Sequence, residues 1–130
     1  MVGAYAFKEE KLDRNAFDQL KEALISKNVE KDEVIFEEGD KAGDGYILSL
    51  GEVLLFQKDK SGNAVEKHKI NSMQVFGIWN SILDSEFRLF TAKASEKCSL
   101  LVIPKATLDK KIKTLDPFLR FCFRQALRLD

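Results

Sequence analysis

The most informative stretch of the chain is Val75-Phe76-Gly77-Ile78-Trp79-Asn80-Ser81-Ile82-Leu83, which is followed by an arginine at position 88. Most of its residues are apolar, and a single glycine interrupts the first of them. Arg88 lies ten positions after Ile78, and Leu89 and Phe90 restore the apolar character directly after it. The segments on either side of this stretch indicate the fold that carries it.

Short runs typical of β-strands surround the stretch. They occupy residues 33–36, 46–50, 53–56, 65–70, 90–94 and 99–103. Turn signals separate them, notably at Gly39, Gly51 and Ser61-Gly62-Asn63. Regularly spaced short strands with glycine turns favour an antiparallel sandwich or barrel. The Ser61-Gly62-Asn63 sequence is expected at the tip of a hairpin.

Helical patterns flank these strands. Apolar residues recur at helical spacing within residues 8–27, where Asp13 or Asn15 can cap the first turn. The helical period returns after Pro104, and Asp116-Pro117 is a typical helix start. The sequence therefore predicts a mainly β protein with one domain over residues 1–130. Its parts are an N-terminal helical segment 8–27, a β-roll over about 29–104, and C-terminal helices over about 105–129.

The composition excludes several classes of protein. The 130 residues are 45% hydrophobic and 32% charged, as in an ordinary globular domain. The 21 basic and 21 acidic residues balance, which argues against electrostatic attraction to nucleic acid or to an anionic membrane. No apolar run approaches the roughly 20 residues that span a bilayer, and the N-terminus lacks the basic region of a signal peptide. With only Cys98 and Cys122, a reduced, cytoplasmic protein is expected.

The order of these segments, together with specific residues along them, resembles the cyclic-nucleotide-binding domain family of the cAMP-receptor-protein type. The resemblance extends from about Phe17 to Leu129 and rests on four motifs. These are Val34-Ile35-Phe36-Glu37-Glu38-Gly39-Asp40, Tyr46-Ile47-Leu48-Ser49-Leu50-Gly51-Glu52-Val53, the stretch Phe76 to Arg88, and Ile103-Pro104. It implies an antiparallel β-roll of jelly-roll type with an N-terminal helix, a short helix inside the stretch, and C-terminal helices.

The family uses this stretch as its phosphate-binding cassette, and we call residues 75–90 the cassette. By resemblance, Gly77 allows backbone N–H groups at the start of the cassette helix to approach an anion. The resemblance also implies that Arg88 pairs with the cyclic phosphate in a charge-assisted contact.

Several residues depart from the family pattern. Ile78 stands where the family carries the glutamate that accepts from the ribose 2′-hydroxyl, and Leu89 and Phe90 stand where it favours small or hydroxylated residues. Met73 replaces a usual glycine and Phe87 a frequent proline. The sequence therefore predicts a degenerate, smaller and more apolar pocket, with no cofactor and with weak or absent binding of cAMP and cGMP. Its vestigial site comprises Phe76, Gly77, Ile78, Arg88, Leu89 and Phe90.

The remaining candidates favour structural roles. Arg88 is either the ligand of an anion or an arginine paired with Glu86 or Asp84. Trp79 is expected in the core or an interface rather than as a platform for a base, and His68 is expected on the surface. One histidine and two distant cysteines supply no metal site, and no catalytic nucleophile is indicated, so the chain is not expected to be an enzyme.

The last segment has apolar residues on more faces than one subunit readily covers. By resemblance to related regulators, whose corresponding helix mediates dimerisation, it is predicted to form an oligomer interface. The alternative is complete burial within its own subunit. The predicted interface residues are Phe118, Leu119, Phe121, Cys122, Phe123 and Leu127.

These observations favour a non-catalytic signalling or scaffold module that acts through homo-oligomerisation and contacts with a protein partner. The alternative is a sensor that binds an anionic small molecule or nucleotide through Arg88 and the backbone near Gly77. A transcription factor is disfavoured, because no helix-turn-helix segment follows the last helix before Asp130. A metal-dependent enzyme of cupin type needs more than the single histidine present.

Overall fold

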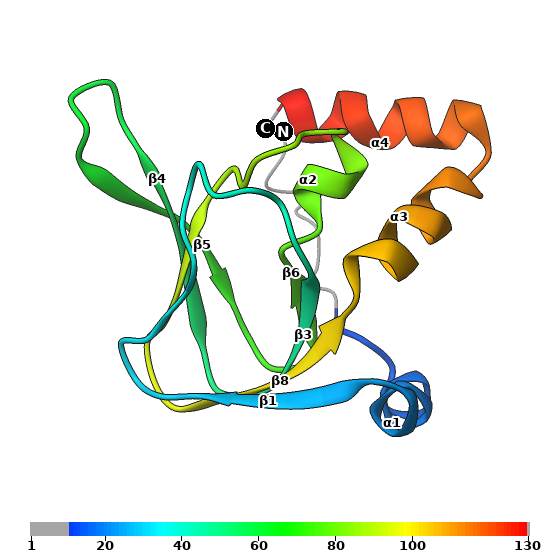
Figure 1. The fold of residues 1–130 in the computed structure, drawn as a ribbon, viewed down its shortest axis with the longest axis horizontal. Coiled ribbons are helices and arrows are strands. Elements are labelled where there is room, and N and C mark those ends of the chain that lie inside the picture. Colours follow the sequence, from blue (N-terminus) through cyan, green and yellow to red (C-terminus); the bar gives the residue numbers. More distant parts are fainter. Residues whose placement is uncertain (1–10, 130) are drawn as a thin grey trace, which may run out of the picture.

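The computed structural model describes residues 11–129, and the side chains of residues 11–126. Within them, eight strands and four helices follow one another along the chain. These are α1 (Arg14–Ala23), β1 (Ile25–Val29), β2 (Val34–Phe36), β3 (Gly45–Leu50), β4 (Val53–Lys58), β5 (Ala64–Ile70), β6 (Gln74–Phe76), α2 (Trp79–Ile82), β7 (Thr91–Ala94), β8 (Cys98–Ile103), α3 (Lys105–Lys113) and α4 (Pro117–Leu129). Figure 1 shows α2, α3 and α4 gathered together, while α1 lies apart from them.

The strands form two antiparallel sheets of four strands each. One sheet has the order β1-β8-β3-β6 and the other β2-β7-β4-β5. The order is non-sequential because strands distant in the chain pair side by side, as β1 does with β8 and β2 with β7. The predicted mainly β class and antiparallel roll with flanking helices are confirmed.

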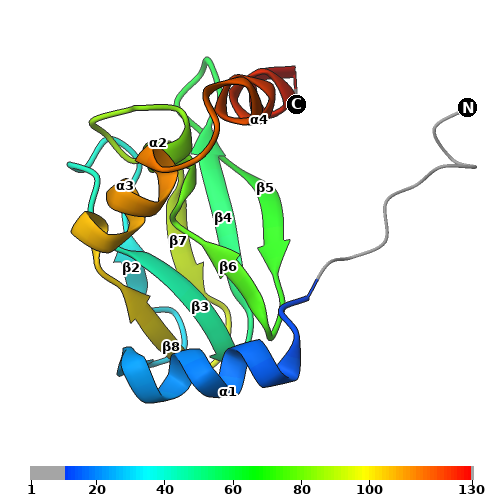
Figure 2. The same cartoon turned by 90° about the vertical axis from the view of Figure 1, so that its right-hand side faces the viewer.

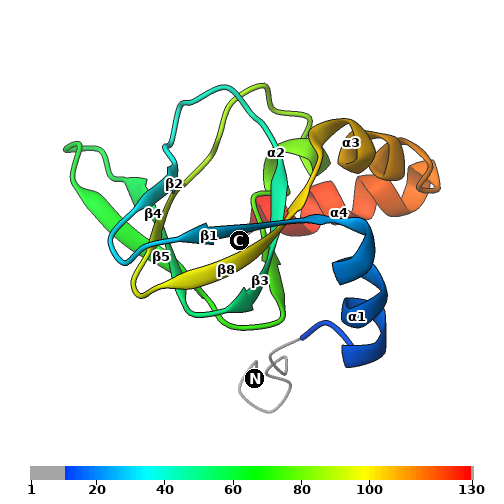
Figure 3. The same ribbon diagram turned by 60° about the horizontal axis from the view of Figure 1, so that its bottom comes forward.

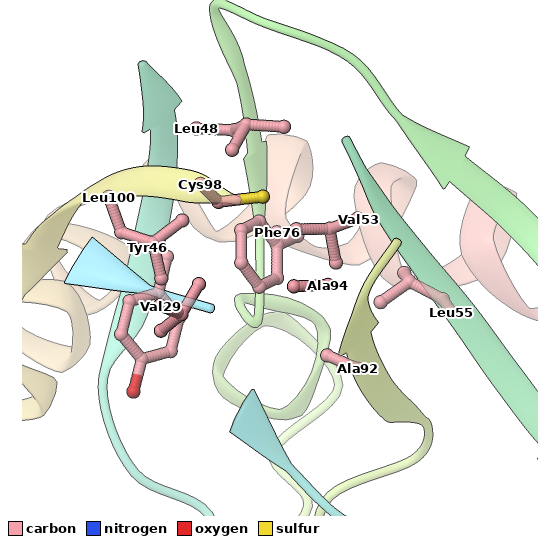
Figure 4. Close-up of a cluster of buried hydrophobic side chains, with 10 residues drawn as sticks. All are labelled: Val29, Tyr46, Leu48, Val53, Leu55, Phe76, Ala92, Ala94, Cys98 and Leu100. Atoms are coloured by element: carbon pink, nitrogen blue, oxygen red, sulfur yellow. The ribbon is translucent and has the colours of Figure 1, made fainter. Parts of the chain in front are cut away.

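The main core lies between the two sheets, as Figure 4 shows. Both sheets contribute buried side chains, including Leu48 and Leu100 from one and Val53 and Ala92 from the other. Alternation along each strand places these residues on the inward face, so that burying them stabilises the stacked pair of sheets.

Helix α1 covers the outer face of the β1-β8-β3-β6 sheet (Figure 2). Phe17 packs there against Ile47 and Leu101 in a second buried cluster. The Asp13 carboxylate caps the helix by accepting from the backbone N–H groups of Asn15 and Ala16, as one of the two predicted caps.

The helix predicted over residues 8–27 is shorter in the structure. It begins at Arg14 and ends at Ala23, and residues 8–10 lie outside the described part of the chain. Leu24 takes an extended conformation, and the chain continues as β1, so the β-roll begins at Ile25 rather than near residue 29. Pairing with β8 from Ile25 to Val29 satisfies the backbone groups of β1, and this long-range partner outweighs the local helical pattern. Figure 3 shows β1 running beside β8 directly after α1.

The turns follow the predicted glycines. Gly39 and Gly51 have φ of 89° and 107°. At Gly51 an added Cβ would lie 2.6 Å from Cys98 Sγ, so the turn between β3 and β4 tolerates no side chain. The β4–β5 hairpin turns at Ser61-Gly62-Asn63 as predicted, and the Asp59 carboxylate accepts from the backbone of Ser61 and Asn63.

Two helices follow the roll, as predicted. Helix α3 begins after Pro104, and Pro117 is the first residue of α4. The Asp116 carboxylate accepts from the backbone N–H groups of Phe118 and Leu119, which satisfies donors that a helix start leaves free.

Candidate functional site

A cavity of about 560 Å³ opens beside the cassette, within the range usual for small-molecule sites. Four parts of the chain line it: residues near α1, the inward residues of β2 and β4, the end of β5 through β6, and the cassette. The lining residues are Lys11, Leu12, Phe36, Leu55, His68, Lys69, Ile70, Met73, Gln74, Val75, Phe76, Gly77, Trp79, Asn80, Arg88, Leu89 and Phe90.

Gly77 turns the chain from β6 into the cassette. Its φ of 77° lies in the left-handed region that favours glycine. A Cβ at this position would lie 3.2 Å from Arg88 Nη1 and 3.3 Å from Phe36 Cε2. Glycine is therefore needed twice, once for the backbone conformation and once to make room for the guanidinium.

The side chain of Arg88 joins the two ends of the cassette by hydrogen bonds. Its Nη1 donates to the carbonyl oxygen of Gly77 at 3.0 Å and to Asn80 Oδ1 at 3.2 Å, and its Nη2 donates to the carbonyl oxygen of Asp44 at 2.6 Å. The guanidinium carbon lies 4.0 Å from the centre of the Phe36 ring, a cation–π contact. Only 5% of the residue is exposed, and burial lowers the pKa of its guanidinium.

The surroundings of Arg88 differ from the predicted pairing with Glu86 or Asp84. No ion pair within the described residues includes Arg88, and Asp84 lies instead 3.8 Å from Arg124. Backbone carbonyls and the amide of Asn80 surround the guanidinium. Arginine stays protonated even when buried, so the cavity has a positive charge in its wall.

Ile78 does not line the cavity with the other five residues of the predicted site. Its Cγ2 atom lies 2.9 Å from where a Cβ on Gly45 would stand, and Leu108 Cδ2 lies 3.3 Å from the same point. The side chain thus packs at the start of β3 beside α3. Its apolar character and the space left by Gly45 account for this position.

Three aromatic rings form one wall of the cavity. The rings of Trp79 and Phe90 have centres 4.6 Å apart, and the ring of His68 lies 4.8 Å from Trp79 and 5.5 Å from Phe90. All three contacts are edge-to-face, the geometry that aromatic rings prefer. His68 is an exposed residue, as predicted, yet it belongs to this wall.

Phe36, His68 and Asn80 also line the cavity, although the sequence did not predict them as parts of the site. The strand alternation offers a signal for His68, since it shares one face of β5 with Ile70, and both line the cavity. Asn80 is a polar residue inside an apolar stretch, and it is 4% exposed. A buried amide needs a hydrogen-bond partner, and Arg88 supplies it.

The predicted interface helix leaves large apolar side chains in solvent. The exposed fractions are 70% for Phe118, 48% for Leu119, 60% for Phe121 and 45% for Phe123. Cys122 is half-buried, and the side chain of Leu127 lies outside the described residues. The helix is held to the cassette by Arg124, whose Nε donates to the carbonyl oxygen of Ile82 at 2.8 Å.

Within residues 11–129, no cluster of three or more histidine, cysteine, aspartate or glutamate side chains has the arrangement of a metal site. Both cysteines are free thiols. Over the same residues, none of the helices has the length and apolar character that crossing a bilayer requires.

Comparison with known proteins places the chain in a family. A family model described as "Cyclic nucleotide-binding domain" matches residues 26–114, more than half of the chain. A search of curated protein sequences gave no match.

Three solved structures illustrate the similarity in fold. The EAL enzyme Bd1971 in its cAMP-bound form has a TM-score of 0.71 and 24% identity, over 80% of this chain and 28% of its own. The cAMP-bound PfPKA-R has a TM-score of 0.64 and 25% identity, over 84% of this chain and 46% of its own.

The third is the c-di-GMP-responsive global regulator CLP of Xanthomonas campestris, with a TM-score of 0.69 and 18% identity over 90% of this chain and 57% of its own. The match therefore covers less than two thirds of the length of each of these three proteins. From its β-roll, its cassette and the match over residues 26–114, the chain belongs to the cyclic nucleotide-binding domain family.

Proposed function

We propose that the chain is a non-catalytic signalling module whose cavity does not recognise the ribose of a cyclic nucleotide and whose output is self-association through α4. Cyclic nucleotide-binding domains are regulatory rather than catalytic. Bd1971 and PfPKA-R, which resemble this chain in fold, are both described in cAMP-bound form. The observation that carries the proposal is Ile78, which stands in the family's glutamate position and packs against Gly45 and Leu108 instead of the cavity.

The loss of this carboxylate has a predictable size. A buried ribose hydroxyl without a partner costs about 1–3 kcal/mol. That cost weakens affinity by about tenfold to more than a hundredfold. Isothermal titration calorimetry with cAMP, cGMP and cyclic dinucleotides is expected to give no saturable heat at micromolar concentration. Micromolar binding of any of them would overturn the proposal.

The exposed face of α4 supports the self-association part. Phe118, Phe121 and Phe123 leave large apolar surfaces in water, and such surfaces commonly mark interfaces. A second copy of the chain covers this face most simply, because the same helix is then contributed by both subunits. Multi-angle light scattering is expected to give a mass of twice the 14.8 kDa monomer or more. A monomer at all concentrations would contradict it and would leave a different protein partner as the occupant.

A second candidate function is a sensor of a small anionic molecule. The observation that favours it is the charge of the cavity. Lys11, Lys69 and Arg88 contribute to its lining, whereas no aspartate or glutamate among the described residues does. A thermal shift by an anion that depends on Arg88 supports this candidate, and its absence for every anion screened argues against it.

A further inference from the structure

The charge of Arg88 is buried, and no carboxylate of the described residues lies within ion-pair distance of it. Burial lowers the pKa of the guanidinium, and the charges of Tyr46, Asp44 and Asp40 offset this only in part. Three of the five guanidinium N–H groups donate to Gly77, Asn80 and Asp44, and each of these acceptors is a neutral oxygen. The other two have no acceptor within the described residues. Buried charges in proteins are usually paired, because an uncompensated ion loses its hydration. A cavity with such a group in its wall attracts a counter-ion.

Much of the remaining cavity wall is apolar. The rings of Trp79, Phe90 and His68 pack edge-to-face, and Leu55, Ile70 and Leu89 add aliphatic surface. A flat apolar body that covers these rings is removed from water together with them, which is favourable in proportion to the area buried.

Polar nucleotides match this lining poorly. A ribose presents hydroxyl groups, and the position of the usual acceptor is occupied by Ile78, which lies outside the cavity wall. Each hydroxyl buried without a partner weakens binding. An aromatic ring carries no such groups, so the lining selects it over a sugar.

We infer that the cavity binds a small monoanion with a flat apolar body, such as an aromatic carboxylate. The carboxylate accepts hydrogen bonds from the Arg88 guanidinium, and the ring lies against the wall of Trp79, Phe90 and His68. This inference rests on the second candidate function above and names the ligand class of that site. The single charge matches the single buried cation, and Lys69, 3.9 Å from Glu52, adds attraction at the solvent side.

The test uses phenylacetate and its neutral amide, phenylacetamide, which differ in charge and share one shape. Trp79 is the only tryptophan of the chain and lies in the cavity wall, so its fluorescence reports occupancy directly. Phenylacetate is expected to change the fluorescence saturably at millimolar concentration or below. Phenylacetamide is expected to bind at least tenfold more weakly. Equal binding of the two, or no saturable change with phenylacetate, would overturn the inference.

Two variants locate the ligand. Phe90→Ala removes one ring of the wall and is expected to weaken phenylacetate binding by at least fivefold while the Trp79 probe remains. Arg88→Lys keeps the charge but loses the planar fork, and is expected to weaken binding at least tenfold. If Arg88→Lys does not fold, the Phe90→Ala variant and the comparison of phenylacetate with phenylacetamide still test the inference.

The matched control is Lys113→Gln, which removes a cation from a separate cavity between α2, α3 and α4. It is expected to leave the affinity for phenylacetate unchanged. A loss of affinity equal to that in Phe90→Ala would show that phenylacetate does not bind beside the aromatic wall.

Calorimetry with cAMP separates the two proposals. Phenylacetate binding without cAMP binding supports both. Absence of phenylacetate binding overturns only the inference, whereas micromolar cAMP binding overturns the loss of ribose recognition.

Discussion

The cassette and helix α4 differ in which side chains they bury: the cassette buries polar side chains, and α4 exposes apolar ones. In the cassette, the polar side chains of Arg88 and Asn80 are buried and bonded to each other and to backbone carbonyls. In α4, apolar side chains such as Phe118 and Phe121 are exposed, and no element within residues 11–129 covers them. In the cassette, three N–H groups of Arg88 have acceptors within the subunit. Helix α4 contacts the cassette through Arg124, but its phenylalanine side chains remain largely exposed. The cassette therefore carries its own internal bonds, whereas the exposed face of α4 is the surface that we propose for self-association.

The largest effect is expected from charged residues on the exposed face of α4. Phe118→Asp with Phe121→Asp places charges on the exposed face and is expected to abolish the self-association that we propose, because burying an unpaired carboxylate opposes association. Sedimentation velocity measures the change. The free energy of unfolding of the monomer is expected to stay within about 0.5 kcal/mol, since these side chains are exposed. An unchanged sedimentation coefficient would show that α4 is not the interface.

Replacing Arg88 is expected to have the second-largest effect, on the free energy of unfolding. Arg88→Ala leaves the oxygens of Gly77, Asn80 and Asp44 without their donor, so the free energy of unfolding is expected to fall by about 3 kcal/mol or more. Urea denaturation monitored by Trp79 fluorescence measures it. Arg14→Ala is the control, because Arg14 pairs with Asp18 on the surface, where an ion pair contributes about 0–1 kcal/mol. Equal effects of the two substitutions would contradict a structural role for Arg88.

Gly77→Ala tests the backbone of the cassette. The positive φ and the close approach to Arg88 and Phe36 both disfavour a Cβ, and a loss of about 1–3 kcal/mol is expected. Gly62→Ala shares the positive φ, but its Cβ meets no atom within 4 Å. Chemical denaturation of both variants separates the two causes. A loss at Gly77 no greater than at Gly62 would show that the close approach is of no consequence.

Met73→Gly is expected to change stability little. Met73 has a φ of 71° where the family usually carries glycine, so glycine relieves about 1–3 kcal/mol of backbone strain. The substitution also removes apolar contacts with the cluster around Phe17, Ile47 and Leu101, which costs a similar amount. The net change in the free energy of unfolding is expected to stay within about 1 kcal/mol. A loss well beyond that in thermal denaturation would mean that packing, not strain, determines this residue.

The smallest effect concerns pH at the junction of the cassette and α3. The Asp109 carboxylate pairs with Lys105 and accepts from Ser81 Oγ, and these contacts lower its pKa. A lowered pKa means that the contribution of Asp109 is present above about pH 4 and is lost as the pH falls through the folded-state pKa. Asp109→Asn is therefore expected to reduce the fall in melting temperature below pH 4. An unchanged profile would assign the acid sensitivity to other carboxylates.

Local signals were sufficient for most of the β-roll. Alternating apolar residues and the glycine turns at Gly39, Gly51 and Gly62 predicted six strands close to their positions, because strands and tight turns are limited mainly by nearby atoms. Strands β1 and β6 were not predicted. The residues of β1 continue a helical pattern locally. Its strand conformation depends on β8, which lies about 70 residues further along the chain.

Some features of the candidate site can likewise be predicted from the local sequence, and others cannot. The chemistry of the cassette, with Ile78 in place of a glutamate and a lone Arg88, can be read from the residues alone. The direction of those side chains cannot, because it depends on what lies nearby in space. Ile78 turns toward Gly45 and Leu108, where there is room, and Arg88 turns toward the carbonyls of Gly77 and Asp44. The strand pattern, the turns and the isoleucine at position 78 of the cassette follow from the sequence, since these depend on neighbours in the chain. The burial of Arg88 without an ion pair, beside an aromatic wall, follows only from the tertiary structure, since that wall joins residues from β5, α2 and the segment before β7.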